Sequence, residues 1–579
     1  KEVKFSIIRE KSNLYFEIND KKWFDLLFPN QDDGLAIDIV SKDRYDCKIE
    51  YVENVQVKGH LLKPVYSEEL KKELKNKGGN IYRVSVGKIP AVFLDKELEY
   101  NILFISNKNS CLYNVLYNLD SYASGLLDMG MYLDSLTYSS KKIKSNNYED
   151  YFVKNKTLKF IIPFKKNTSE YSQADIKPIY DSLRLTNFNI KTIKIKAYSS
   201  IEGIESRNVK LRKLRANSIV TALQSFQKPT IKTHISSSDN WVEFFNDIKN
   251  TPYQHLTLLT KKEVREKIAG TMSREMQSIF KNHRKAVLEI ELEKKDKYSR
   301  ELVDVLLTRF NLAIAANNLK EAKEIQNSVF EKLKYKEASI DVLEKMKIPK
   351  QAKFVKLSNK NSVFKYMLDF RQGLIVYDEL LELEKLAPKD AEIKYNLIAL
   401  KITLRHLKAI EVDDVELLSE INQLKKYGID KSLILKMATN FYMIISEKFM
   451  KNRDFSNKDK LVETINNNQK KFILSDHDYL SLAQFFSYCN NNKLAVELLE
   501  NKARSIDINE DLLFYYLNLT LVNKELTKDP NYRTVMLNAI NINVSRFCKL
   551  FNNIDDGGIT FQLLEDAYLR KAFCENCNN

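Results

Sequence analysis

The chain has 579 residues, too many for one hydrophobic core, so about three or four domains are expected and a single small fold is excluded. Hydrophobic residues at 44% are ample for packed cores, and a content of only 13 glycines and 10 prolines favours long helices over glycine-rich all-β folds. The formal net charge of +16 concentrates polyanions at the surface, which keeps nucleic acid, anionic lipid headgroups and cell-wall polymers open as partners.

Residues 1–150 are predicted to form a strand-rich N-terminal domain of unknown role. Five segments alternate or run apolar with β-branched and aromatic residues, and Asn, Asp and Gly breaks separate them. These predicted strands are 3–8, 14–18, 35–40, 81–86 and 98–105. The closing stretch, 113–136, spaces its apolar side chains three and four residues apart and is therefore predicted to be a helix or a pair of helices.

Residues 151–295 alternate strand and helix patterns, which is typical of an α+β domain with a βαβ unit. The predicted strands are 158–164, 190–198 and 285–293, and the predicted helices are 174–185 and 208–226. The second helix is expected to bury one side. That side consists of Leu211, Leu214, Ile219, Leu223 and Phe226.

Residues 296–579 keep a helical period almost throughout, with short Asn, Asp and Pro breaks. Several stretches have the same layout of helix, tight break and second helix, with small residues where two helices would cross closely. These stretches are 310–333, 381–402 and 485–503. They resemble degenerate tetratricopeptide repeats, and an ordinary helical bundle is the alternative. The resemblance implies a long concave surface that binds other proteins.

One stretch, 193–223, carries more information than the fold class. A predicted strand leads into the polar loop 199–203, and Asn208 or its neighbours then open a basic helix. A loop-to-helix junction exposes unpaired N–H groups and the positive end of the helix dipole, so it favours an anion. Arg215 lies on that helix, and its planar guanidinium suits a carboxylate. The alternative is an ordinary solvated amphipathic helix.

The spacing of Gly203, Asn208, Leu211, Arg215 and Ala216 resembles the signature of the OmpA C-terminal-like domain, a peptidoglycan-binding module of Gram-negative envelopes. Segments 160–183 and 282–292 resemble that family's first strand and helix and its closing strand. The resemblance covers the predicted 151–295 domain. It implies a site for the peptide stem of the wall. The candidate ligand-binding residues are Ser199, Ser200, Glu202, Gly203, Asn208, Leu211 and Arg215.

The predicted site departs from the family at one position. In the family an Asp meets the ammonium of diaminopimelate and an Arg, here Arg215, meets its carboxylate. Ser200 stands at the Asp position, which removes a charge-assisted contact of about 1.5–3 kcal/mol. Glu202 is a candidate substitute. The alternatives are a domain kept only for folding and protein contacts, or a site for another anion.

Six cysteines are present, and two of them form the motif Cys574-Glu-Asn-Cys577. This pair is compatible with disulfides, with unpaired structural thiols, or with redox or metal chemistry. The sequence also leaves undecided whether the other four cysteines form disulfides. They are Cys47, Cys111, Cys489 and Cys548. The chain begins with Lys1, which suggests removal of a secretory signal peptide.

Catalytic motifs are not found in the sequence: there is no GxGxxG, GxxxxGK[ST], GxSxG or HExxH pattern, and the six histidines are isolated. No catalytic residue, metal site, cofactor or transmembrane segment is predicted, and the chain is predicted not to be an enzyme. The resemblances together imply a secreted, non-enzymatic periplasmic scaffold or tether. It would be an accessory subunit of an outer-membrane assembly or secretion complex, associated with the outer membrane and binding peptidoglycan.

Three alternatives to this function remain at the level of sequence. The first is a pure protein–protein interaction scaffold with a degenerate OmpA-like domain. The second is a basic nucleic-acid-binding protein, because 30 tyrosines and 30 phenylalanines interleaved with lysines can stack on bases. The third is an envelope hydrolase with a dispersed active site.

Overall fold

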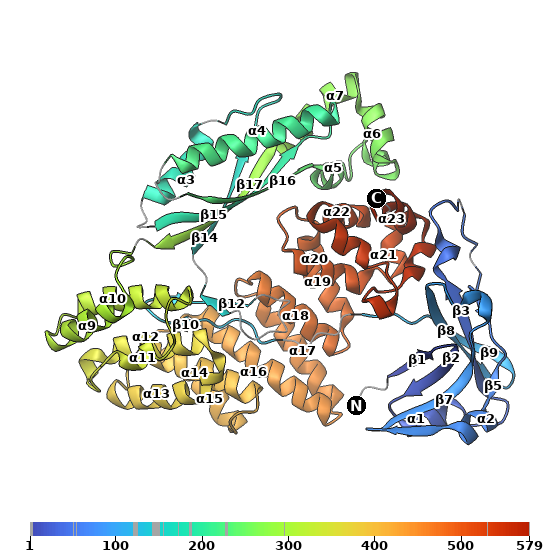
Figure 1. The fold of residues 1–579 in the computed structure, drawn as a ribbon, viewed down its shortest axis with the longest axis horizontal. Helices are drawn as coiled ribbons and strands as arrows, with labels where there is room; N and C mark the ends of the chain where they lie inside the picture. The colour runs from blue at the N-terminus through green and yellow to red at the C-terminus, as the bar shows by residue number, and fades with distance from the viewer. Residues whose placement is uncertain are drawn as a thin grey trace. The chain divides into compact units, whose positions relative to one another are not determined.

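The structure is a computed structural model that describes residues 4–577 apart from short gaps. The gaps are residues 50, 54, 120–124, 142–150, 154–155, 172, 185–187, 226–229, 295 and 530. The described chain is a multidomain α+β protein, with antiparallel sheets near its start, a mixed sheet with a helix around 189–292, and an all-helical region over 303–577 (Figure 1). It forms two compact units. Unit 1 contains residues 1–121 and 500–579, and unit 2 contains residues 122–499.

Unit 1 begins with two antiparallel sheets. The first has the order β1-β2-β7-β6, built from β1 (Phe5–Glu10), β2 (Asn13–Ile18), β6 (Lys75–Gly78) and β7 (Ile81–Lys88). The second has the order β4-β3-β8-β9 with β5 paired to β3, built from β3 (Gly34–Ser41), β4 (His60–Leu61), β5 (Val65–Tyr66), β8 (Leu98–Ser106) and β9 (Asn109–Asn114). The connections hold α1 (Lys21–Leu27), η1 (Lys42–Tyr45), α2 (Ser67–Glu73) and η2 (Ala91–Phe93). The five predicted strands are confirmed as β1, β2, β3, β7 and β8.

The two sheets share one apolar core because alternate residues of each strand point to the same face. Side chains from both sheets enter this cluster, among them Leu14, Phe16, Ile37, Ile39, Val84, Val86, Ile102 and Phe104. The residues between them on the central strands are buried as well, so β3 and β8 are covered on both faces. A second layer must therefore cover the outer face of the second sheet.

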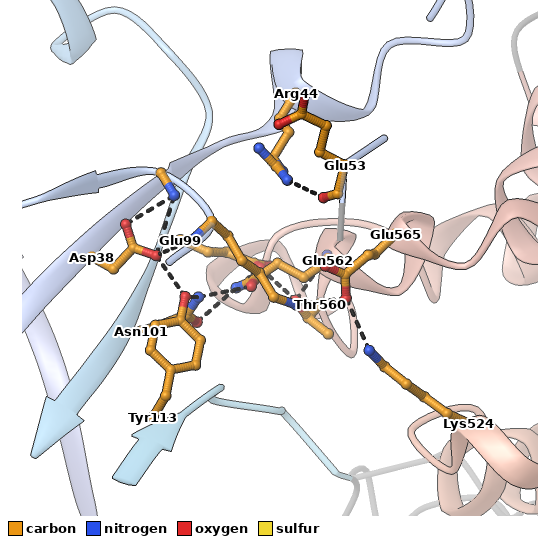
Figure 2. Close-up of polar contacts among 12 residues, drawn as sticks. Asp38, Arg44, Glu53, Glu99, Asn101, Tyr113, Lys524, Thr560, Gln562 and Glu565 are labelled. Atoms are coloured by element: carbon orange, nitrogen blue, oxygen red, sulfur yellow. Dashed lines mark hydrogen bonds and ion pairs between the residues drawn. The ribbon is translucent and has the colours of Figure 1, made fainter. Parts of the chain in front are cut away.

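The last eighty residues of the chain supply that layer. The helices of this segment are α20 (Glu510–Thr520), α21 (Lys524–Lys528), α22 (Tyr532–Lys549), η7 (Ile554–Asp556), η8 (Phe561–Glu565) and α23 (Ala567–Cys577). Figure 2 shows side chains of β8 meeting those of η8. Asn101 and Gln562 exchange two amide hydrogen bonds of 2.9 Å each, and both side chains are buried. Lys58 pairs with Glu565 at 2.8 Å.

Two disulfides lie in unit 1. Cys47 is bonded to Cys574 across 527 residues of sequence, and Cys548 is bonded to Cys577. Both thiols of the Cys574-Glu-Asn-Cys577 motif are therefore in disulfides, each with a partner outside the motif. Cys111 and Cys489 are free thiols.

The predicted helix over 113–136 is wrong wherever its residues are described. β9 ends at Asn114, and the later part is extended, with only the short strands β10 (Met131–Tyr132) and β11 (Leu136–Thr137) pairing with each other. β12 (Ser139–Lys141) and β13 (Tyr151–Val153) form another small pair. Leu127, Met129 and Met131 are buried at every second position, which is the period of an extended chain. The spacing of three and four arose because half-buried apolar residues flank these three, namely Leu126, Tyr132, Leu133 and Leu136.

The middle of unit 2 is a mixed sheet of order β14-β17-β15-β16. Its elements are β14 (Lys156–Pro163), α3 (Gln173–Arg184), β15 (Phe188–Ser199), α4 (Glu205–Gln224), β16 (Lys232–Asp239), α5 (Trp241–Asp247), η3 (Gln254–Leu258), α6 (Lys261–Ile268), α7 (Thr271–Glu275), α8 (Gln277–His283) and β17 (Lys285–Lys294). β15 and β16 are parallel and joined through α4, as the predicted βαβ unit requires. The predicted strands and helices of this segment are confirmed.

The prediction of the buried side of α4 is only partly right. Ile219 and Leu223 are buried, Leu211 is half-buried, and Leu214 is 54% exposed. Phe226 lies outside the described residues. The reason is that two arginines of α4, rather than Leu214, point toward the sheet.

The rest of unit 2 consists of helix pairs. The helices are α9 (Val303–Ala315), α10 (Leu319–Lys334), α11 (Val342–Lys345), η4 (Ala352–Phe354), α12 (Val355–Leu368), η5 (Phe370–Gln372), α13 (Gly373–Leu386), α14 (Ala391–His406), α15 (Asp414–Gln423), η6 (Leu424–Tyr427), α16 (Lys431–Lys451), α17 (Phe455–Gln469) and α18 (Asp476–Tyr488). They are followed by α19 (Asn492–Ala503), which begins in unit 2 and ends in unit 1. The side chains of Asn318, Asp390 and Ser475 cap helix N-termini, which explains where α10, α14 and α18 begin. We call helices α9 to α18 the helical array. The three predicted helix pairs are confirmed.

Candidate functional site

The predicted binding loop follows β15 and precedes α4. Ser199 is the last residue of β15, and its hydroxyl donates to Asp239 at 2.5 Å. Ser200 donates to Glu202 at 3.2 Å. Both serines are 3% exposed. The structure therefore brings the predicted serines and Glu202 together, in an interior setting.

Among the described residues, Arg215 is one of the largest side chains with almost no exposure, at 1%. Its guanidinium donates to three backbone carbonyls, those of Thr168 at 3.0 Å, Lys165 at 3.1 Å and Tyr198 at 3.3 Å. The ring of Phe164 packs against it at 4.8 Å. The guanidinium nitrogens that could bind a ligand carboxylate therefore already donate to the protein's own backbone.

The charge of Arg215 is compensated weakly. Burial lowers the pKa of Arg215 to about 10, and the nearby charges of Arg284 and Arg212 act in the same direction. Carbonyl oxygens supply partial negative charge but no full counter-charge. The guanidinium remains protonated at neutral pH because a pKa of 10 is far above 7.

Glu202 accepts hydrogen bonds from the protein on both carboxylate oxygens. One oxygen pairs with Arg284 at 2.6 Å, and the other accepts from Lys166 at 2.9 Å. Ser273 and Gln277 also donate to that second oxygen, at 2.9 and 2.8 Å. Burial alone would raise the pKa of Glu202, but the hydrogen bonds from Lys166, Gln277 and Ser273 outweigh it and lower the pKa. This carboxylate is ionised and already surrounded by donors.

A second carboxylate, Asp239, organises the other side of the loop. Asp239 pairs with Arg212 and Arg265 and accepts from Ser199. Asn208 donates to the carbonyls of Ser200 and Glu202, both at 3.1 Å. The amide of Asn208 therefore closes the loop from inside.

The helix begins slightly before Asn208, near the start that was predicted. α4 begins at Glu205 with Ile204 at the cap position and no side-chain cap, and Asn208 lies within the helix. Gly203 is exposed at φ +82°, a left-handed conformation that favours glycine. Gly203 thus turns the chain, while Leu211 packs at the half-buried edge.

Sequence reasoning missed Asp239, Arg284 and Lys166, which complete this network. One signal was available for Asp239. Ser199 and Asp239 are the register partners at the ends of two parallel strands, so a βαβ unit places them side by side. Arg284 and Lys166 come from distant segments, and no local pattern marks them.

The arrangement holds several charged side chains in the interior of this segment. Buried Arg212 pairs with Asp239 and buried Arg284 pairs with Glu202, whereas the guanidinium of buried Arg215 binds backbone carbonyls. Within the described residues, no group of three or more His, Cys, Asp or Glu side chains could hold a metal ion. Nor does any helix in the described part of the chain have the length and apolar character to cross a membrane.

Comparison with known proteins does not assign the chain to a family. No protein-family model matches the chain, and no curated protein matches it significantly.

Proposed function

We propose that the protein is a non-enzymatic interaction scaffold of the cell envelope, in which an OmpA-like domain serves as a structural module and a tetratricopeptide-like array as an interaction module. The observation that carries this proposal is the state of Arg215, whose guanidinium is 1% exposed and held by three backbone carbonyls. A stem-peptide carboxylate would have to displace those bonds, and each lost bond to a charged group costs about 1.5–3 kcal/mol.

The envelope location is part of the proposal and has separate support. Two disulfides persist in oxidising compartments, and the bacterial periplasm is one of them. The net charge of +16 favours contact with anionic envelope components.

The scaffold function is tested by native electrophoresis of gently solubilised envelopes, with the chain detected by antibody. We expect the chain in a complex far larger than itself. Migration of all the material at the size of the free chain contradicts the proposal.

Wall binding is a second candidate, because the buried charge of Arg215 has only backbone carbonyls as hydrogen-bond partners and the Nε atoms of Arg212 and Arg284 lack a hydrogen-bond partner. A sedimentation assay with purified sacculi separates the two candidates. The scaffold proposal predicts no retention of the wild-type chain. Retention that free diaminopimelate competes away, and that Arg215→Lys reduces at least tenfold, would establish wall binding instead.

A further inference from the structure

The segment of residues 125–137, which we call the strap, runs in extended form along one side of the helical array (Figure 1). The strap contacts α12, α14, α16 and α18, which are alternate helices of the array. Polar side chains of these helices bind its backbone. They are Asn359, Asn396, Lys436, Asn440 and Asp478.

Two asparagines each form a pair of hydrogen bonds with one strap residue. Asn440 accepts from the N–H of Leu127 at 2.7 Å and donates to its carbonyl at 2.9 Å. Asn396 does the same with Tyr132, at 2.7 and 2.8 Å. A side-chain amide used in this way replaces a neighbouring β-strand. Such an amide recognises the peptide backbone of the strap residue, whatever side chain that residue carries.

Other side chains of the array form hydrogen bonds with the strap backbone from Leu127 to Tyr132. Asp478 accepts from the N–H of Asp128 at 2.9 Å, and Lys436 donates to the carbonyl of Asp128 at 3.2 Å. Asn359 adds a bond of 3.1 Å to the carbonyl of Tyr132. Asn359, Asn396, Asn440 and Asp478 are all 0% exposed. Four fully buried polar side chains directed at one backbone form a built recognition surface.

Charge contacts fix the far end of the strap. Asp134 pairs with Lys360 at 2.6 Å and with Lys323 at 3.0 Å. Lys360 is 4% exposed on its side chain, so this lysine is desolvated when the strap is bound. The two ion pairs thus require an acidic side chain at this position.

The strap leaves part of the groove unfilled. A cavity of about 250 Å³ lies between strap residues 125–131 and the array, with Met367, Phe370, Leu400 and His406 in its wall. This pocket has room for a further apolar side chain, which would gain dispersion contacts with its wall.

We propose that the groove is a peptide-binding site, that the strap is its resident ligand, and that an extended segment of a partner protein replaces the strap. The partner segment carries an acidic residue for Lys323 and Lys360 and an apolar side chain for the cavity. This inference rests on the proposed scaffold function, because a scaffold needs a surface that takes partners. A tethered ligand has a high effective concentration, so the strap keeps the groove closed to weak ligands.

The test uses the full chain and a labelled synthetic peptide, GLLDMGMYLDSLT, with the sequence of the strap. In the variant Asp134→Lys the strap meets Lys323 and Lys360 with like charge, which opens the groove without altering it. Fluorescence polarisation should show the peptide binding Asp134→Lys at least tenfold more tightly than the wild type. Asn396→Ala in the Asp134→Lys background should weaken binding at least tenfold, while Lys451→Ala on the exposed side of α16 should not.

A well-folded Asp134→Lys variant that fails to bind the peptide overturns the proposal. Equal binding of a peptide with Lys at the Asp134 position also overturns it. A second measurement on the wild type decides the question if Asp134→Lys does not fold. The amides of Leu127, Asp128 and Tyr132 should exchange with deuterium at least tenfold faster than buried amides of α14, because the strap opens locally. Equal rates would mean that the strap leaves only on global unfolding, and the proposal then fails.

The two proposals fail in different ways. Loss of peptide binding, with a large envelope complex intact, removes the groove and leaves the scaffold. A chain that migrates alone from envelopes but binds the peptide after opening keeps the groove and removes the scaffold.

Discussion

Glu99 shows what burial does to a single carboxylate. The side chain is 3% exposed and accepts from the hydroxyl of Thr560, the N–H of Phe561 and the amide of Gln562 (Figure 2). These donors are neutral, so they offset only part of the cost of removing the charge from water. Burial therefore raises the pKa of Glu99 despite them.

This raised pKa predicts a pH-dependent difference between the wild type and Glu99→Gln. The folded state holds the Glu99 proton more tightly than the unfolded state, so the stabilisation is complete below the unfolded pKa of about 4.5 and is lost as pH rises through the folded pKa. Urea unfolding at a series of pH values should show the wild type losing stability relative to Glu99→Gln from pH 4.5 upward. A constant difference across this range contradicts the assignment.

Arg215 gives a second prediction at this scale. Arg215→Ala should destabilise the mixed sheet by about 3 kcal/mol or more, because one buried and two part-buried hydrogen bonds to carbonyls are lost and a cavity remains. The fluorescence of buried Trp241 in α5 follows this unfolding, with Trp23→Phe as the background. Lys213→Ala, at an exposed position on the same helix, is the matched control and should change stability by less than about 0.5 kcal/mol.

At the scale of elements, strands and helices that bury one face could be predicted from the sequence. β2 and β7 alternate cleanly, and the helix pairs of the array have their own caps and turns. The strap could not be predicted, because its hydrogen-bond partners lie more than 200 residues away. The contacts of the candidate site could not be predicted for the same reason. Arg215 was placed correctly on α4, but the carbonyls that occupy it belong to residues 165–168 and to Tyr198.

The dependence of the strap on the array predicts a large effect for one asparagine. Asn440→Ala leaves the N–H and carbonyl of Leu127 without partners, which should cost about 2–3 kcal/mol in the stability of the array. Guanidinium unfolding followed by far-ultraviolet circular dichroism measures this loss. Lys451→Ala lies on the same helix and should have no measurable effect. If Asn440→Ala left the free energy of unfolding unchanged, water would have replaced the amide at no cost, contrary to this prediction.

At the scale of the whole molecule, unit 1 is assembled from the two ends of the described chain. The Cys47–Cys574 bond joins segments 527 residues apart and so removes much of the entropy of the unfolded chain. Cys574→Ser should lower the stability of unit 1 by about 2–5 kcal/mol. Trp23 in α1 reports on unit 1, and the transition reported by Trp241 should not move.

The free thiol Cys111 provides the control for this prediction. Cys111 is exposed on β9, and Cys111→Ser should leave both transitions unchanged. The disulfide assignment is wrong if the oxidised wild type and Cys574→Ser unfold at the same denaturant concentration.

The sharing of unit 1 between two distant segments orders the events of biosynthesis. The outer face of β3 and β8, with the buried Asp38, Glu99 and Asn101, cannot be covered until residues 553–565 have been made and delivered. A nascent chain therefore carries an unfinished sheet through the synthesis of more than four hundred residues. Any chain that stops early keeps this polar, half-built face open to solvent.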